Sequence, residues 1–164
     1  MGIFTKVKAI WALGLVVLFS CQKDKQFSDL PFLRFEGYDW VDKSGIEVVK
    51  VRLYFTDGNG DVGLNNDQLN PPFDLGSPYY YNLWVKYYER TDSGWTEVNT
   101  ALPYSARLPN LTPNGQNKTL EATIEYDLDP SQAISDSVKF SFILLDRALN
   151  LSNEVFSNAI YVAP

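Results

Sequence analysis

The strongest constraint on this chain is a period-two alternation of apolar and other residues that recurs along most of its length. In 49–56, Val49, Val51, Leu53 and Phe55 alternate with lysine, arginine, tyrosine and threonine. Successive side chains of a strand point to opposite faces, so each such segment has one apolar face to bury. We expect strands at 32–36, 49–56, 83–88, 95–98, 120–128, 138–144 and 155–162. No window shows a helical stripe, and the pattern predicts an all-β antiparallel sandwich.

One turn sequence refines this expectation. The strand at 138–144 is followed by Asp146-Arg-Ala-Leu-Asn-Leu-Ser152. This segment resembles the turn of bacterial immunoglobulin-like and fibronectin-III-like domains, which often read Asp-x-Ala-Gly-Asn-x-Ser. The resemblance implies an immunoglobulin-like sandwich of about seven strands over residues 30–164. In such a sandwich the loops 57–81 and 146–153 share one end with the start of the first strand.

The first 20 residues have the composition of an export signal. Lys6 and Lys8 precede an apolar run at 9–19, which is too short for the roughly 20 residues that span a bilayer. The run ends in Leu-Phe-Ser-Cys21, which resembles the lipobox of bacterial lipoproteins. The resemblance implies a signal peptide at 1–20, acylation of Cys21 and a flexible tether at 21–29 that holds the domain to a lipid bilayer. The alternatives are that Cys21 is a stray thiol in a signal peptide or a buried small apolar residue.

The tether also bears on location. Lys23 and Asp24 resemble the charged signals that direct lipoproteins of Bacteroidota to the cell surface. The resemblance implies a lipid-anchored protein of the outer membrane, with the cell surface as one destination. A merely solvated linker explains the same residues.

Composition excludes several classes of function. The whole chain of 164 residues carries a formal net charge of −6, and removal of the signal with its two lysines leaves 144 residues and a charge of −8. An acidic chain without a basic run is a poor ligand for nucleic acid. Histidine is absent, which removes Ser-His-Asp chemistry and imidazole zinc sites. No catalytic constellation is evident, and we expect no enzyme.

One loop carries the residue types of a metal site. The strand at 49–56 runs into Asp57-Gly-Asn-Gly-Asp-Val-Gly, and Asp67 follows. Oxygen ligands at alternate positions of a glycine-rich loop suit Ca²⁺. The loop resembles Asp-x-Asp-x-Asp calcium loops, and a Phe-Thr-Asp-Gly-Asp-Gly-Asp-Ile-Gly segment of Bacteroidota surface lipoproteins. The expected ligands of a structural calcium ion are Asp57, Asn59, Asp61, Gly63 and Asp67. A Gly/Asn/Asp turn that needs no metal is the alternative.

The same loop is rich in aromatic residues. Phe73 follows two prolines, and Tyr79, Tyr80 and Tyr81 stand in a row. Aromatic faces dominate many interfaces, so these four side chains form a candidate binding platform for a protein or a sugar. They serve equally well as a plug at the end of the sandwich.

Two functional hypotheses follow. The first is a non-enzymatic accessory lipoprotein that interacts with an outer-membrane protein assembly. The second is a carbohydrate-binding surface lipoprotein that serves glycan uptake, with Trp40, Trp84, Trp95 and the tyrosine row as stacking candidates.

Overall fold

The computed structural model of the chain describes residues 26–162, so Cys21 and the expected signal peptide lie outside the described residues. The described part contains strands and loops, and no helix in it is long and apolar enough to cross a membrane. Its strands are β1 Phe32–Lys43, β2 Ile46–Asp57, β3 Leu83–Thr91, β4 Gly94–Glu97, β5 Leu120–Leu128, β6 Ser137–Leu144, β7 Val155–Phe156 and β8 Ile160–Tyr161.

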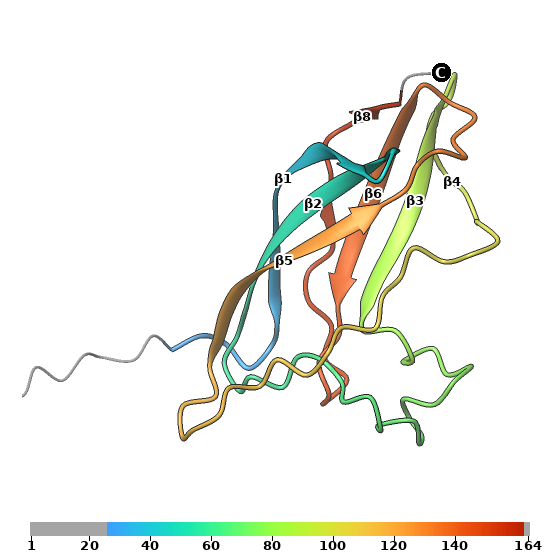
Figure 1. The fold of residues 1–164 in the computed structure, drawn as a ribbon. Helices are drawn as coiled ribbons and strands as arrows, with labels where there is room; N and C mark the ends of the chain where they lie inside the picture. The colour runs from blue at the N-terminus through green and yellow to red at the C-terminus, as the bar shows by residue number, and fades with distance from the viewer. Residues whose placement is uncertain (1–25, 163–164) are drawn as a thin grey trace, which may run out of the picture.

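The strands form two antiparallel sheets packed face to face (Figure 1). One sheet has the order β1-β2-β5. The other has the order β4-β3-β6-β7, with β8 also paired to β6. Every pairing between these strands is antiparallel. The predicted all-β sandwich is therefore confirmed.

The core lies between the inner faces of the two sheets. The alternating residues of β2 that the sequence marked as apolar are fully buried, and so is the apolar face of β6. Phe35 of one sheet stacks on Phe142 of the other with ring centroids 6.5 Å apart. Tyr87 and Tyr104 lie against Phe140 at 5.3 and 5.1 Å. Burial of these large rings, together with the valines and leucines of the same faces, stabilises the packing of the two sheets.

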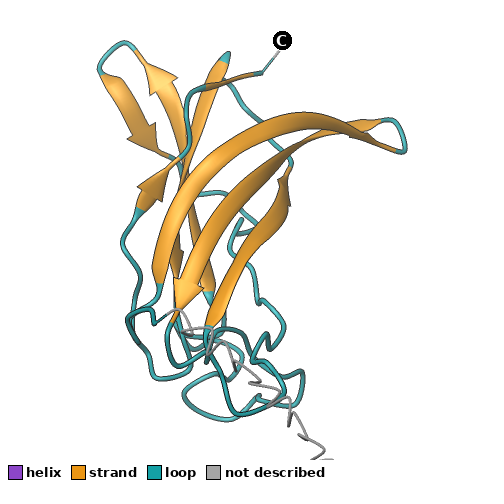
Figure 2. Cartoon of the chain, turned by 90° about the vertical axis from the view of Figure 1, so that its left-hand side faces the viewer, coloured by secondary structure: helices purple, strands orange, loops and turns teal. Residues whose placement is uncertain are grey.

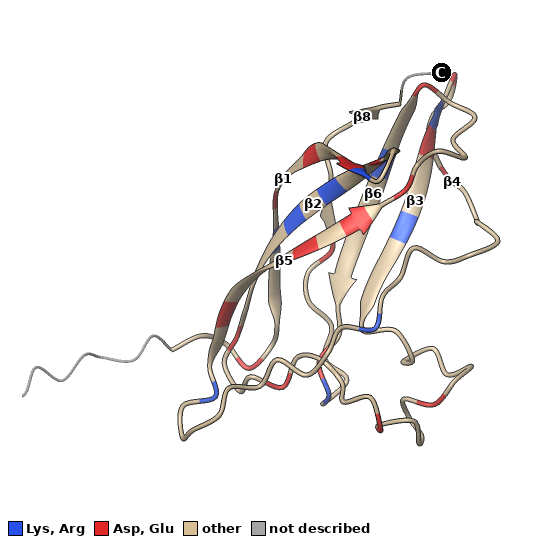
Figure 3. Cartoon of the chain, viewed as in Figure 1, with Lys and Arg blue, Asp and Glu red and all other residues tan. Residues whose placement is uncertain are grey.

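The outer face of the β1-β2-β5 sheet is charged but self-compensating (Figure 3). Basic side chains of β2 lie between acidic side chains of its neighbours: Arg52 pairs with Asp39 of β1, and Lys50 pairs with Glu125 of β5 at 3.0 Å. Cross-strand pairs of opposite charge favour this strand order.

The final strand region differs from the sequence-based expectation. The expected strand at 155–162 is divided into β7 and β8. Phe156 pairs with Ser141, whereas Ile160 pairs with Val138, so this edge carries one more residue than β6 between the two pairs. The Ser157 hydroxyl fills the interruption by accepting from the backbone N–H of Phe140 at 3.0 Å. The inserted residue shifts the phase of the alternation between Val155 and Ile160, and strands of two residues are too short to show such a shift in the sequence.

The long loops gather at one end of the sandwich (Figures 1 and 2). This loop pole consists of the loops 58–82, 106–119 and 145–154. The described chain begins there too, since the backbone N–H of Gly58 donates to the carbonyl of Ser28 at 2.7 Å. The backbone N–H of Arg147 donates to the carbonyl of Asp61 at 3.1 Å, which joins the first and last of these loops. The predicted meeting of both loops with the start of β1 is confirmed.

Candidate functional site

The expected calcium loop begins at a buried acid. Asp57 is the last residue of β2 and is 0% exposed. Its Oδ2 accepts from the backbone N–H of Asp61 at 3.1 Å, and Oδ1 of Asn59 accepts from the same N–H at 3.3 Å. The chain therefore curls back on itself within one turn. The structure brings together Asp57, Asn59 and Asp61, as their alternate spacing predicts.

Two glycines allow this loop to lie tightly against its neighbour. Gly60 has a φ of +64°, and a Cβ there would lie 1.6 Å from the carbonyl oxygen of Lys118. Gly63 has a φ of +89°, and its Cβ would lie 1.9 Å from the carbonyl oxygen of Pro109. A side chain is excluded at both positions by backbone conformation and by space. These glycines hold the loop 58–82 against the loop 106–119.

A third acid, which the sequence analysis did not assign to the site, comes from the β6–β7 loop. Asp146 is buried and forms an antiparallel bridge with Val62. Its carboxylate accepts from the backbone N–H and the side-chain amide of Asn150 at 2.7 and 2.8 Å. The N–H of Ala148 in turn donates to Oδ2 of Asp61 at 3.1 Å. We expected the loops 57–81 and 146–153 to meet at one end of the sandwich. The turn motif that contains Asp146 did not indicate that this residue would lie beside Asp57 and Asp61.

The neighbouring acids raise the cost of ionising Asp57 and Asp61. Burial, followed by the charge of Asp61 and then that of Asp146, raises the pKa of Asp57 from its usual 3.8 to about 6. Burial and the charge of Asp146 also raise the pKa of Asp61, although Arg147 works in the opposite direction. Oδ1 of Asp57 and Oδ1 of Asp61 are buried and accept no hydrogen bond. The cluster therefore holds more negative charge than its surroundings stabilise.

Arg147 is the basic residue that could balance the negative charge of these acids. Its guanidinium donates to the carbonyl of Gly63 at 2.8 Å, to Oδ1 of Asn110 at 2.9 Å and to the hydroxyl of Thr112 at 2.5 Å. Within residues 26–162, no ion pair joins a lysine or arginine to Asp57, Asp61 or Asp146. Arg147 thus fastens the neighbouring loops together instead of pairing with the acids.

The remaining expected ligands lie in other settings. The carbonyl of Gly63 is engaged by Arg147. Asp67 is exposed and lines a shallow hollow of about 390 Å³ beside Asn65 and Phe73. The structure joins Asp67 to no member of the acid cluster by a hydrogen bond. Its role as a ligand stays a prediction.

The aromatic part of the loop 58–82 is organised around Arg107. The guanidinium of Arg107 donates to four backbone carbonyls of this loop, those of Asn65, Gln68, Phe73 and Tyr80, at 3.4, 2.5, 3.4 and 2.8 Å. It also lies 5.0 Å from the centre of the Tyr80 ring. Arg107 was not predicted from the sequence, because the residues next to it give no sign that its side chain binds the backbone of a distant loop.

The expected platform is only partly accessible. Phe73 is buried, and Tyr79, Tyr80 and Tyr81 are half-buried. The indole N–H of Trp84 donates to the carbonyl of Tyr81 at 2.8 Å, so this tryptophan helps to fix the row. A binding role of these four aromatic side chains stays a prediction.

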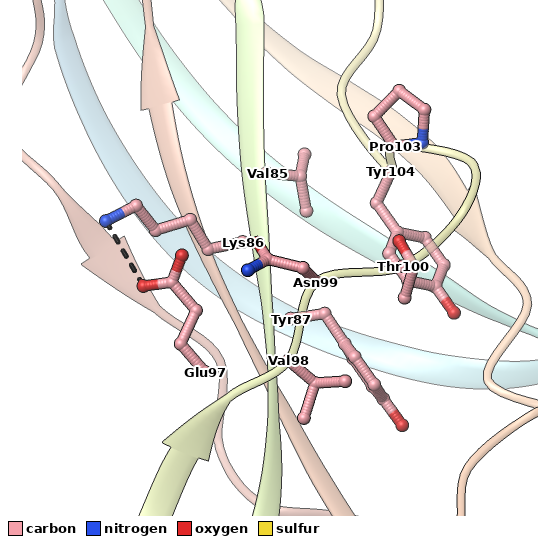
Figure 4. Close-up of a pocket in the computed structure, with 9 residues that line it drawn as sticks. All are labelled: Val85, Lys86, Tyr87, Glu97, Val98, Asn99, Thr100, Pro103 and Tyr104. Atoms are coloured by element: carbon pink, nitrogen blue, oxygen red, sulfur yellow. Dashed lines mark ion pairs between the residues drawn. The ribbon is translucent and has the colours of Figure 1, made fainter.

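Three hollows lie away from the loop pole, and one of them, of about 490 Å³, is lined by Leu102 and Asp129 among others. The smallest, of about 120 Å³, borders β3 and contains Lys86 paired with Glu97 at 3.5 Å (Figure 4). It is below the roughly 300–1,000 Å³ of small-molecule sites. The largest, of about 590 Å³, lies near the opposite end of the sandwich. The exposed rings of Trp40 and Tyr161 line it together with Ile46 and Glu47.

The chemistry within reach of the acid cluster is that of hard oxygen ligands. In the described part of the chain, no three Asp, Glu, His or Cys side chains are grouped closely enough to hold a metal ion. A cation at Asp57 and Asp61 would therefore complete its coordination with amide and carbonyl oxygens and water.

Comparisons of the chain with protein-family models, with curated proteins and with solved structures found no match.

Proposed function

We propose that this chain is a non-enzymatic lipoprotein, anchored in the outer membrane through acylated Cys21, that acts as an accessory or interaction subunit of an outer-membrane protein assembly. The observation that supports this proposal most strongly is the ordered loop 58–82. It presents exposed leucines at the end of the sandwich where the described chain begins. A calcium ion at the acid cluster belongs to this proposal as a structural element.

The place where the described chain starts supports a membrane-facing loop pole. The carbonyl of Ser28 accepts a hydrogen bond from the backbone N–H of Gly58, at the beginning of the loop 58–82. An anchor only a few residues before Ser28 would keep this end of the sandwich close to the bilayer, because a short tether has little reach. A partner in the same membrane would then meet the loop pole first.

The loop itself has the properties of a docking surface. It is longer than the roughly 12–15 residues beyond which structureless loops are uncommon and mostly functional. Leu75 is 80% exposed and Leu69 is also exposed, while Arg107 holds the backbone around them. A backbone that is already ordered loses less conformational entropy on binding. The leucines are therefore presented in a form suited to an apolar partner surface.

The test is purification of the tagged full-length protein from its own membranes in mild detergent, with identification of what accompanies it. Leu75→Asp places a charge on the loop pole. Ile134→Asp is the matched control, since Ile134 is 96% exposed on the β5–β6 loop at the opposite end. We expect wild type and Ile134→Asp to retain a stoichiometric membrane-protein partner and Leu75→Asp to lose it. A protein recovered outside the membrane fraction, or one without a partner, contradicts the proposal.

A second candidate function, carbohydrate binding, is favoured by the hollow at Trp40 and Tyr161. Sugar rings stack on exposed aromatic faces, and Glu47 adds an acceptor for hydroxyl groups. Glycan arrays probed with the full-length protein test this function. Binding that Trp40→Ala removes supports it, and an absence of binding by wild type ends it.

A further inference from the structure

The two loops that meet at the loop pole bring acids from distant parts of the sequence into one place. Asp57 and Asp61 come from the loop after β2, and Asp146 from the loop after β6. The bonds from Arg147 N–H to the carbonyl of Asp61 and from Ala148 N–H to its Oδ2, both 3.1 Å, fix the second loop on the first. Both contacts pass through Asp61, which makes this residue the junction between the loops.

The cluster has unused acceptor capacity. Asp57 is fully buried, and its Oδ1 has no hydrogen-bond partner. Oδ1 of Asp61 is also buried and without a partner. A buried acceptor that loses water without gaining a partner destabilises the folded state, and a buried charge does so more strongly. Two such oxygens on adjacent carboxylates need a positive charge between them, which is either a proton shared by the two carboxyl groups or a bound cation.

The basic side chains of the surrounding loops do not fill this role. Lys118 donates to the carbonyl of Pro113 at 2.9 Å. Arg147 donates to Gly63, Asn110 and Thr112. Both donate to oxygens outside the cluster, so Arg147 acts on Asp61 only through its charge and leaves the unpartnered oxygens open to an external cation.

We propose that Asp57 and Asp61 bind one calcium ion through their unpartnered oxygens, and that Asp146 adds negative charge from the second loop, so that the ion clamps the β2–β3 loop to the β6–β7 loop. All side chains at the site offer oxygen and none offers nitrogen or sulfur as a metal ligand, which selects a hard cation. Asn59, backbone carbonyls and water complete the coordination. This site does not depend on a docking partner, because its ligands belong to this chain alone.

Calcium fits this arrangement better than magnesium. Ca²⁺ accepts six to eight oxygens in irregular geometry, whereas Mg²⁺ requires a near-ideal octahedron. Two carboxylates on a loop with mixed neutral ligands correspond to a weak site. We expect a dissociation constant of about 10⁻⁴–10⁻³ M, as in extracellular calcium modules.

The experiment uses full-length protein in detergent, stripped with EDTA and titrated with CaCl₂ or MgCl₂ by calorimetry and thermal melting. We expect one calcium per chain and, at tenfold excess over the dissociation constant, a rise in Tm of about 5 °C. Asp61→Asn should weaken calcium binding at least tenfold, and Asp146→Asn severalfold. Asp92→Asn, in the exposed β3–β4 turn, is the matched control and should bind as wild type does.

Each contrary result removes a defined part of the proposal. Wild type that neither binds calcium nor changes its Tm up to about 10 mM overturns the site. Equal binding by wild type and Asp61→Asn overturns the assigned ligands, and equal binding by Asp146→Asn overturns the clamp. Asp61 is only partly buried, so its variant tests the ligands even if Asp57→Asn does not fold.

Discussion

Two charged side chains organise neighbouring regions of the loop pole in opposite ways. Arg107 places its guanidinium among four carbonyl oxygens of the loop 58–82 and beside the Tyr80 ring. Asp57 has one backbone N–H on Oδ2 and nothing on Oδ1, with the like charges of Asp61 and Asp146 nearby. The first charge is satisfied by the protein's own backbone, whereas the second is not.

The difference separates the loop into two functional halves. Residues 65–80 are held by Arg107, whose charge does not change with pH, so these contacts persist across the pH range. Residues 57–61 surround groups whose charge state depends on solution conditions. The stable half presents the leucines, and the responsive half joins the last loop. A partner bound to the leucines would thus meet a surface whose edge contains carboxyl groups with raised pKa values.

The largest effect is expected for Arg107→Met, which keeps an unbranched apolar side chain and removes the guanidinium donors. The carbonyls of Gln68 and Tyr80 would lose their closest donor, and we expect the free energy of unfolding to fall by about 3 kcal/mol. Chemical denaturation of the full-length protein in detergent measures it. The loss should be the same in EDTA and in calcium, and a loss that calcium reverses would break the distinction between the two halves.

The sandwich and part of the site were predictable because their signals are local. The alternation in β2 and β6 reports burial directly, and the spacing of Asp57, Asn59 and Asp61 encodes one turn of the loop. Asp146 and Arg107 were not found, because each acts on residues far away along the chain. Their positions follow from the packing of the loops 106–119 and 145–154 on the loop 58–82, which no local pattern specifies.

A smaller effect, of opposite sign, is expected for Asp57→Asn in calcium-free buffer. Because the folded-state pKa of Asp57 is raised to about 6, the folded protein holds a proton that the unfolded chain releases near pH 4. The stability of wild type should therefore fall as the pH rises from about 4 to 6 and then level off. Above pH 7 the variant should be more stable than wild type by about 2 kcal/mol.

Denaturation curves of both proteins at pH 4, 6 and 8 measure this difference, which should vanish at pH 4. Calcium at about 100 times the dissociation constant should reverse the order at pH 8, since only wild type gains the ion and its stabilisation of about 2.7 kcal/mol exceeds this difference. A variant that is less stable than wild type at every pH in EDTA would mean that Asp57 is already satisfied by the fold.

The smallest effect is expected for Asp67→Asn. This variant distinguishes the calcium ligands predicted from sequence spacing, which include Asp67, from those indicated by the structure, which do not. Asp67 is exposed and lies in the hollow beside Asn65, on the side of the loop that Arg107 holds. Its neutralisation should change the free energy of unfolding by less than about 0.5 kcal/mol. The calcium midpoint, measured by calorimetry beside Asp61→Asn, should stay at the wild-type value. A weakening equal to that of Asp61→Asn would restore Asp67 as a ligand and extend the ion-dependent half of the loop to residue 67.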